Sequence, residues 1–218
     1  MSIPSITFSF NQFQNQDYHP SSQEIKKFKA NNEDLSEIFK AKCEEFKKLM
    51  DDEIKDFQNK YNNVNINKYP DEIKFYGNND KYYELSPFYY VSDNISFAGI
   101  KFSSSEQLVC FAKAIYANEL NTAFKILIQS KSYYAYNYAK KINECLEWNN
   151  IYYPIIYTAN NYKFKNEEMK NKLLETKEKY IIYDSKYDNR LGIGKDGKGH
   201  NILGIILMMI RDKLWIEF

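Results

Sequence analysis

Two charged side chains of opposite sign are spaced so that one face of a helix would carry both. Glu106, Cys110 and Lys113 stand at positions i, i+4 and i+7, and this spacing places side chains on the same side of a helix. The rest of that face is apolar, and a carboxylate or an ammonium group on an inward face must be paired or have a function. The spacing alone favours a structural ion pair between Glu106 and Lys113 over a functional site.

A glycine-rich segment near the C-terminus is the second feature that suggests chemistry. Five of the seven glycines lie between Gly192 and Gly204. The letters match two phosphate-binding motifs, but one match lacks the Ser or Thr that holds magnesium, and the other is not followed by a further strand. Glycines that precede a helix, with Asn201 as its N-cap, can turn amide N–H groups toward an anion. A flexible surface turn is the alternative, and Asp188 would by itself be a turn residue.

The composition limits the kinds of partner and cofactor that the protein is expected to bind. The 218 residues carry a net charge of +1, so no global field draws the protein toward nucleic acid or a membrane surface. Three cysteines without a CxxC pair and two histidines predict reduced thiols, no metal site and no cofactor. Arginine occurs only at Arg190 and Arg211 in a chain rich in lysine, so these two positions carry more information than any lysine.

The distribution of apolar residues predicts a soluble, cytoplasmic protein. The N-terminal segment lacks a basic stretch followed by an apolar stretch, which is the signature of a secretory leader. The longest apolar run, residues 202–210, is interrupted by Gly204 and is too short to span a bilayer. We therefore expect no contact with a membrane.

The chain begins with an N-terminal extension that precedes the candidate side chains. Residues 1–31 are polar and predict an irregular arm with at most a short helix at 23–29. An apolar stripe then steps by three and four residues, which predicts one long amphipathic helix. This stripe consists of Leu35, Phe39, Cys43, Phe46, Met50, Ile54, Phe57 and Tyr61. We expect it to pack on the protein's own core, and self-association through a coiled coil is the alternative.

The residues after Pro70 predict a compact α+β domain that is predominantly helical, with a small antiparallel sheet. Strands are expected at 73–76 and 88–91, and a hairpin at 93–101 with its turn near Ala98 and Gly99. The serines at 103–105 offer a cap to a helix at 106–116. Further helices are expected at 120–129, 134–146, 166–177 and 202–214. The absence of alternating strands and helices argues against a doubly wound sheet.

From about Ile73 to Leu214, several segments resemble the motifs of one family in the order that the family has them. Phe75-Tyr76 resembles an opening strand, and Leu85-Ser86-Pro87-Phe88-Tyr89 resembles L-S-N-F-Y. Ser105-Glu106-Gln107 with Lys113 resembles an S-x-E-H helix that ends in A-x-K. Trp148, Lys163-Phe164 and the Leu-Leu-Glu-Thr of 173–176 keep the spacing of the family's W, K-F and L-L-A-T.

The most specific block comes last. Asp188-Asn189-Arg190-Leu191-Gly192-Ile193-Gly194 resembles D-x-x-W-G-x-G. Gly199-His200-Asn201-Ile202-Leu203-Gly204 resembles G-x-N-x-L-G, and Leu207-Met208 with Arg211 resembles L-M-x-x-R. Together these segments resemble the NADAR family (NAD- and ADP-ribose-associated, also called YbiA-like). The resemblance divides the chain into an extension, residues 1–70, and a NADAR-like domain, residues 71–218.

The resemblance implies an N-glycosidase that acts on a nucleotide, a riboflavin-pathway intermediate or an ADP-ribosylated nucleobase, with nucleic acid only as the carrier of a modified base. It implies that Glu106 is the catalytic carboxylate. Lys113 would pair with Glu106, contact phosphate or attack C1 of the opened sugar as an amine, and Asp188 would hold ribose hydroxyls or position water. A ribose cation gains from a nearby carboxylate, and phosphates need donors. The expected substrate-binding residues are Tyr76, Phe88, Tyr89, Trp148, Leu191, Gly192, Gly194, Gly199, His200, Asn201 and Arg211.

Four residues depart from the family's pattern. Gln107 stands for a histidine, Pro87 for an asparagine, Leu191 for a tryptophan and Tyr183 for a glutamate. Two alternatives therefore accompany the glycosidase. One is an impaired member of the family that only binds ligands of the NAD or ADP-ribose type, and the other is an interaction protein that uses its N-terminal helix.

Overall fold

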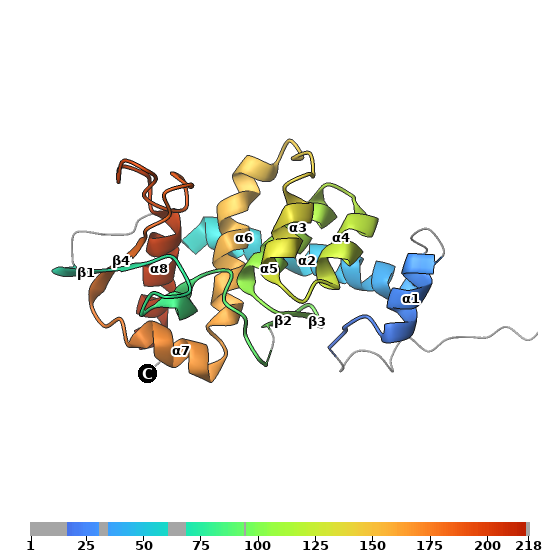
Figure 1. The fold of residues 1–218 in the computed structure, drawn as a ribbon, viewed down its shortest axis with the longest axis horizontal. Helices are drawn as coiled ribbons and strands as arrows, with labels where there is room; N and C mark the ends of the chain where they lie inside the picture. The colour runs from blue at the N-terminus through green and yellow to red at the C-terminus, as the bar shows by residue number, and fades with distance from the viewer. Residues whose placement is uncertain (1–16, 31–34, 61–68, 94, 217–218) are drawn as a thin grey trace, which may run out of the picture.

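The computed structural model describes residues 17–30, 35–60, 69–93 and 95–216 and has the expected α+β, predominantly helical architecture (Figure 1). The elements in chain order are α1 (Ser22–Ala30), α2 (Glu37–Lys60), β1 (Asp71–Phe75), the 3-10 helix η3 (Tyr83–Leu85), β2 (Ile95–Phe97), β3 (Ile100–Phe102), α3 (Ser105–Tyr116), α4 (Leu120–Leu127), α5 (Ser132–Ala139), α6 (Trp148–Lys163), α7 (Glu167–Leu174), β4 (Lys179–Tyr183) and α8 (Ile202–Ile216). None of the helices described is long and apolar enough to cross a bilayer.

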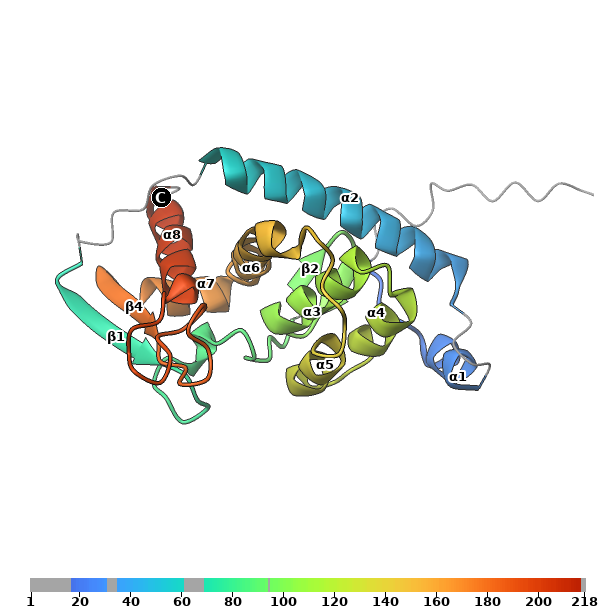
Figure 2. The ribbon, with the colours of Figure 1, turned by 90° about the horizontal axis from the view of Figure 1, so that it is seen from above.

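The predicted long helix is α2, and it packs on the protein's own core as expected. It runs along one side of the molecule against α6 and α3 (Figure 2). Phe39, Phe46 and Met50 are fully buried, and the Phe46 ring lies 4.9 Å from the ring of Phe111 on α3. Tyr61 lies outside the described residues. The stripe is therefore buried within the chain. Self-association through the other faces of α2 stays a prediction.

The arm before α2 is more ordered than its polar composition predicts. Helix α1 is one residue longer at each end than expected, and Ser21 and Glu24 form a capping box at its N-terminus. The Ser21 hydroxyl accepts a hydrogen bond from the Glu24 amide at 3.2 Å, and the Glu24 carboxylate accepts one from the Ser21 amide at 2.9 Å. The Tyr18 hydroxyl also donates to Glu24, at 3.0 Å. Residues 1–16 of the predicted arm lie outside the described residues.

The strands form two small two-stranded sheets. The predicted hairpin is the antiparallel β2–β3 pair, and Ala98 and Gly99 turn it with φ of 53° and 66°. The second sheet pairs β1 with β4 in parallel, which the sequence did not predict. The expected strand at 88–91 is wrong, because Phe88 lies in a turn and residues 89–91 are irregular. Just before this segment, the Pro87 carbonyl accepts a hydrogen bond from the Glu106 amide at 2.9 Å.

Helix α6 forms the centre of the domain and was not predicted. It contacts α2, α3 and α8, and its residues from Pro154 to Asn160 are buried without interruption. A helix that is buried on nearly all sides shows no amphipathic period, so its sequence pattern is uninformative. The expected helix at 134–146 is shorter, since α5 ends at Ala139 and Leu146 is fully exposed.

Candidate active site

A cavity of about 370 Å³ opens between α3, α5, the first turns of α6 and the loop that follows β4. It is lined by Glu106, Val109, Cys110, Lys113, Tyr136, Ala139, Lys140, Glu144, Trp148, Tyr152, Asp188 and Arg190. All three predicted catalytic residues therefore lie around one space, although they are up to 82 positions apart in the sequence, from Glu106 to Asp188. Trp148 is the one predicted substrate-binding residue that lines the same space.

The carboxyl group of Glu106 is placed by the first turn of α3. Ser104 caps this helix, and its hydroxyl accepts a hydrogen bond from the Gln107 amide at 3.0 Å. The Cys110 thiol, one turn further on, donates to Glu106 Oε1 at 3.5 Å. Among the residues that the structure describes, Glu106 has no ion-pair partner. Burial, together with the nearby charge of Asp188, raises the pKa of Glu106 to about 7.

The ion pair that the spacing favoured, between Glu106 and Lys113, does not form. Lys113 pairs instead with Glu144, at 3.2 Å, and its ammonium lies 5.7 Å from the centre of the Trp148 ring. Seven residues of helix span roughly 10 Å, which separates two side chains on the same face even when both point inward. The structural interpretation of Glu106 therefore fails on geometry, and its carboxyl group remains available to a ligand.

Asp188 combines the two interpretations that the sequence left open. Its Oδ1 accepts hydrogen bonds from the amides of Arg190 and Leu191, both at 2.8 Å, which is the turn role expected of an Asp. The residue also lines the cavity, and its charge is felt at Glu106. The turn thus places a second carboxylate beside the first.

Aromatic rings form one wall of the cavity. Trp148 is buried, and its ring centre lies 5.5 Å from that of Tyr152 one turn along α6. Tyr136 on α5 also lines the cavity, with the predicted Phe88 packed behind it at 6.0 Å. Neither Tyr136 nor Tyr152 was predicted. Tyrosine is abundant in this chain, and no motif marks these two positions.

The other predicted aromatic residues lie elsewhere. The Tyr89 ring packs on Tyr83 at 5.6 Å, and the Tyr76 ring packs on Tyr183 at 5.8 Å. Neither residue lines the cavity.

The glycine-rich loop does not present the predicted cradle of amides, because its own carbonyl groups accept many of the amide hydrogens. At the start of α8, the amides of Ile202 and Leu203 donate to the carbonyls of Arg190 and Leu191 at 3.2 and 3.0 Å. The amides of Gly194 and Gly199 are bonded in the same manner, to Ser185 and Ile193. The glycines serve close packing of the backbone. A Cβ on Gly199 would lie 2.5 Å from the Gly192 carbonyl oxygen.

Asn201 is not the side-chain cap of α8 but a brace on β4. Its Oδ1 accepts a hydrogen bond from the Tyr183 amide at 2.9 Å, and its Nδ2 donates to the Ile181 carbonyl at 2.8 Å. Gly204 follows one turn later because a Cβ there would lie 2.0 Å from that same Ile181 oxygen. His200 is exposed. Gly192, Gly199, His200 and Asn201 do not line the cavity, and Gly194 lines a separate, shallower one with Lys186 and Asp196.

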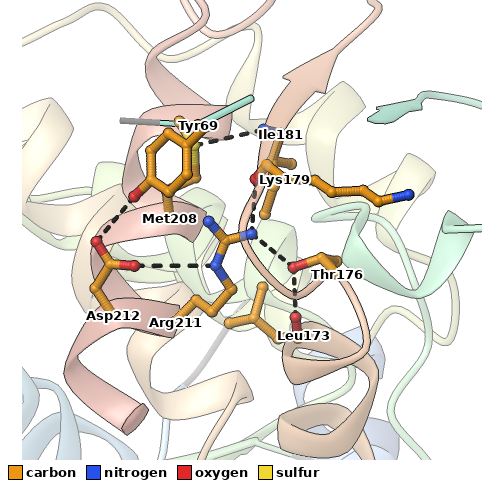
Figure 3. Close-up of polar contacts among 8 residues, drawn as sticks. All are labelled: Tyr69, Leu173, Thr176, Lys179, Ile181, Met208, Arg211 and Asp212. Atoms are coloured by element: carbon orange, nitrogen blue, oxygen red, sulfur yellow. Dashed lines mark hydrogen bonds and ion pairs between the residues drawn. The ribbon is translucent and has the colours of Figure 1, made fainter. Parts of the chain in front are cut away.

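Arg211, predicted to bind substrate, is a fully buried structural clamp (Figure 3). Its Nη1 donates to the Thr176 hydroxyl and to the Lys179 carbonyl, each at 2.8 Å. The rings of Tyr69 and Trp215 lie on its guanidinium group, each with its centre 5.1 Å away. The motif arginine therefore fastens α8 to the turn before β4, and it does not line the cavity.

The four departures from the family's pattern do not line the cavity either. Gln107 ties α3 to the end of α4, since its Nε2 donates to the carbonyls of Ile126, Leu127 and Gln129 at 3.0 to 3.2 Å. Leu191 and Tyr183 are buried. The Pro87 carbonyl caps α3. None of these four residues therefore lines the cavity, although Tyr183 lies close enough to Glu106 for the two charges to interact.

Comparison with known proteins identifies the family. A family model described as the NADAR domain matches residues 74–215. The solved NMR structure of the E. coli protein YbiA is similar with a TM-score of 0.60 and 25% sequence identity, over 68% of this chain and 88% of that chain. A search of curated proteins found no match. In the part of the chain that the structure describes, no three His, Cys, Asp or Glu residues converge as metal ligands would. Since the match spans well over half of the sequence and includes every element around the cavity, this chain belongs to the NADAR family, which is associated with N-glycosidase activity.

Proposed function

We propose that this protein hydrolyses the N-glycosidic C1–N bond of a ribose derivative, with Glu106 as the catalytic carboxylate. The observation that carries the proposal is the position of Glu106, which lines the cavity without an ion-pair partner among the described residues. An unpaired acid in a half-buried setting costs stability, and such groups concentrate at functional sites.

The reaction requires the groups that the cavity contains. As the C1–N bond breaks, its electron pair stays on the base nitrogen and positive charge develops on the ribose. A carboxylate at Glu106 stabilises that charge. Water then forms the new C–O bond at C1, and the proton that it loses passes to a carboxylate or to the departing base. Asp188, on the same cavity, is the second carboxylate for this step.

The remaining walls suit the parts of a nucleotide that do not react. The rings of Trp148 and Tyr152 offer flat apolar surface to a base. Lys113 is engaged with Glu144, so its role is to hold that wall and to supply positive charge nearby. We propose that the substrate is a small nucleotide, a riboflavin-pathway intermediate or an ADP-ribosylated nucleobase, and that nucleic acid takes part only as the carrier of such a base.

A protein of this family that only binds its ligand is the second candidate, and the four departures from the family's pattern favour it. The structure weakens that argument, because none of the four residues lines the cavity. The third candidate, an interaction protein that uses the stripe on α2, is disfavoured because the stripe is buried within the chain.

A substrate panel tests the proposal. The full chain is incubated with NAD, with a pyrimidine ribosyl phosphate of the riboflavin pathway and with ADP-ribosylated guanine, and free base and free sugar are measured. We expect stoichiometric release of both from at least one compound. Glu106→Gln should abolish release, and Glu147→Gln, an exposed carboxylate outside the cavity, should not.

Binding without release from any compound would favour the second candidate. Equal release by wild type and Glu106→Gln would remove Glu106 from the mechanism.

A further inference from the structure

Arg190 is the one arginine that lines the cavity. The chain has two arginines, and the other, Arg211, is fully buried in the core. Arg190 is exposed and lies at a position that the family's D-x-x-W-G-x-G pattern leaves open. The family's motifs therefore do not explain it, and the loop amides that were expected to bind an anion are bonded within the loop.

The backbone and side chain of Arg190 are held in place by their neighbours. Its amide donates to Asp188 Oδ1 at 2.8 Å, and its Nε donates to the Tyr153 hydroxyl at 3.3 Å. The guanidinium carbon lies 5.2 Å from the centre of the Tyr152 ring and 5.4 Å from that of Tyr153. These contacts orient the guanidinium plane before any ligand arrives, which lowers the entropic cost of binding.

The outer edge of this group is unoccupied. No residue that the structure describes accepts a hydrogen bond from Nη1 or Nη2 of Arg190. Two further cations line the same cavity, Lys140 and Lys113, and Lys113 is paired with Glu144. A guanidinium with free terminal nitrogens presents two parallel N–H donors, and this geometry matches the oxygens of a phosphate group. The cavity therefore carries carboxylates at Glu106 and Asp188, a third at Glu144 that is paired with Lys113, and a fixed anion-binding group at Arg190.

We propose that Arg190 is the specificity-determining residue of this site and that it selects ligands whose ribose carries a phosphate group. The inference rests on the proposed function, whose candidate substrates carry phosphate, and assigns the residue that recognises this phosphate. The shared chemistry is a phosphate oxyanion, which comes either from a terminal monophosphate or from the pyrophosphate of ADP-ribose. Arg190 contacts the phosphate group and leaves C1 to the carboxylates.

Calorimetric titration of the full chain tests the inference without requiring turnover. The probes are ribose 5-phosphate, ADP-ribose and unphosphorylated ribose, at one fixed salt concentration. We expect the wild type to bind at least one phosphorylated probe roughly 10 to 100 times more tightly than ribose, the scale of charge-assisted hydrogen bonds. Arg190→Gln should abolish that preference. Arg190→Lys should restore part of it, because an ammonium group keeps the charge but lacks the fork.

A matched control separates the contact from general electrostatics. Lys198→Gln removes the same charge from an exposed position on the same loop that does not line the cavity, and it should leave the preference intact. If ribose 5-phosphate alone gains affinity through Arg190, the ligand is a terminal monophosphate. If ADP-ribose alone gains and loses that gain in Arg190→Gln, it is a pyrophosphate, whereas a gain that Arg190→Gln keeps comes from the adenosine.

The inference would be overturned if Arg190→Gln kept the full preference, if Lys198→Gln lost as much, or if wild type bound no phosphorylated probe more tightly than ribose. If the proposed function fails while the inference holds, the preference for phosphate depends on Arg190 but no compound of the substrate panel is hydrolysed.

Discussion

Replacement of Glu106 by glutamine should make the folded protein more stable, and mainly at neutral and alkaline pH. In the folded chain, burial and the charge of Asp188 raise the pKa of this carboxyl group from 4.5 to about 7. Folding therefore favours its protonated form. As the pH rises from 4.5 through 7, the unfolded chain loses this proton before the folded chain does, so the free energy of unfolding falls. Glutamine has nearly the same shape and carries no charge at any pH.

The size of the effect follows from the shift. A difference of about 2.5 pKa units corresponds to roughly 3 kcal/mol at pH 8, since each unit is worth about 1.4 kcal/mol. This value is an upper bound, because Glu106 is half-buried and faces an open cavity. At pH 5, the same relation gives a gain below about 1 kcal/mol. The stabilisation should therefore grow severalfold between the two pH values.

Urea unfolding of wild type and Glu106→Gln at pH 5 and pH 8 measures this difference. Glu147→Gln is the control, because it makes the same chemical change at an exposed position outside the cavity. It should shift the free energy of unfolding by less than about 0.5 kcal/mol at either pH. A destabilised Glu106→Gln protein, or a gain that is equal at both pH values, would refute the argument that the carboxylate is strained in the folded state.

Three further predictions concern the surroundings of Glu106 and the loop. Asp188→Asn keeps the acceptor for the turn but removes a charge that raises the pKa of Glu106, so the midpoint of the pH–rate profile that reports Glu106 should move down. Cys110→Ala removes a hydrogen bond that lowers the same pKa, so the same midpoint should move up. If both variants shifted the midpoint in the same direction, both assignments would be contradicted. Gly204→Ala would bring a Cβ within 2.0 Å of the Ile181 carbonyl oxygen, and a clash of this kind costs about 1–3 kcal/mol or more. Thermal unfolding should show a lower melting temperature, and an unchanged one would mean that α8 can move away from β4 freely.

The sequence pattern predicted the elements that face the core on one side and solvent on the other. Helix α2 has a core side and a solvent side, so its apolar stripe has a helical period, and Phe39 and Phe46 were correctly assigned to the core. Helix α6 has no such contrast, and β4 pairs with a strand more than 100 residues away in the sequence. Neither element leaves a local pattern, and both were missed.

The candidate site was predictable where chemistry is tied to a motif. Glu106, Asp188 and Trp148 were placed together through the family resemblance, and the structure brings them to one cavity. Arg211 was misassigned, since it is buried in the core. A motif records that a residue type is required and does not record whether packing or ligand binding requires it. The glycines do not line the cavity around Glu106, and their binding role stays a prediction. Arg190 lies between motif positions, so only the fold shows that it lines the cavity.

The rate of bond cleavage in Glu106→Gln tests the central claim most directly. A single-turnover experiment, with enzyme in excess over the substrate that the panel identifies, separates the chemical step from binding and product release. If the carboxylate stabilises the ribose cation, the first-order rate constant should fall by a factor of ~100 or more while the dissociation constant changes little, because that charge exists only near the transition state. A rate constant within a factor of about three of the wild type, with the same affinity, would contradict the assignment of Glu106 as the catalytic carboxylate.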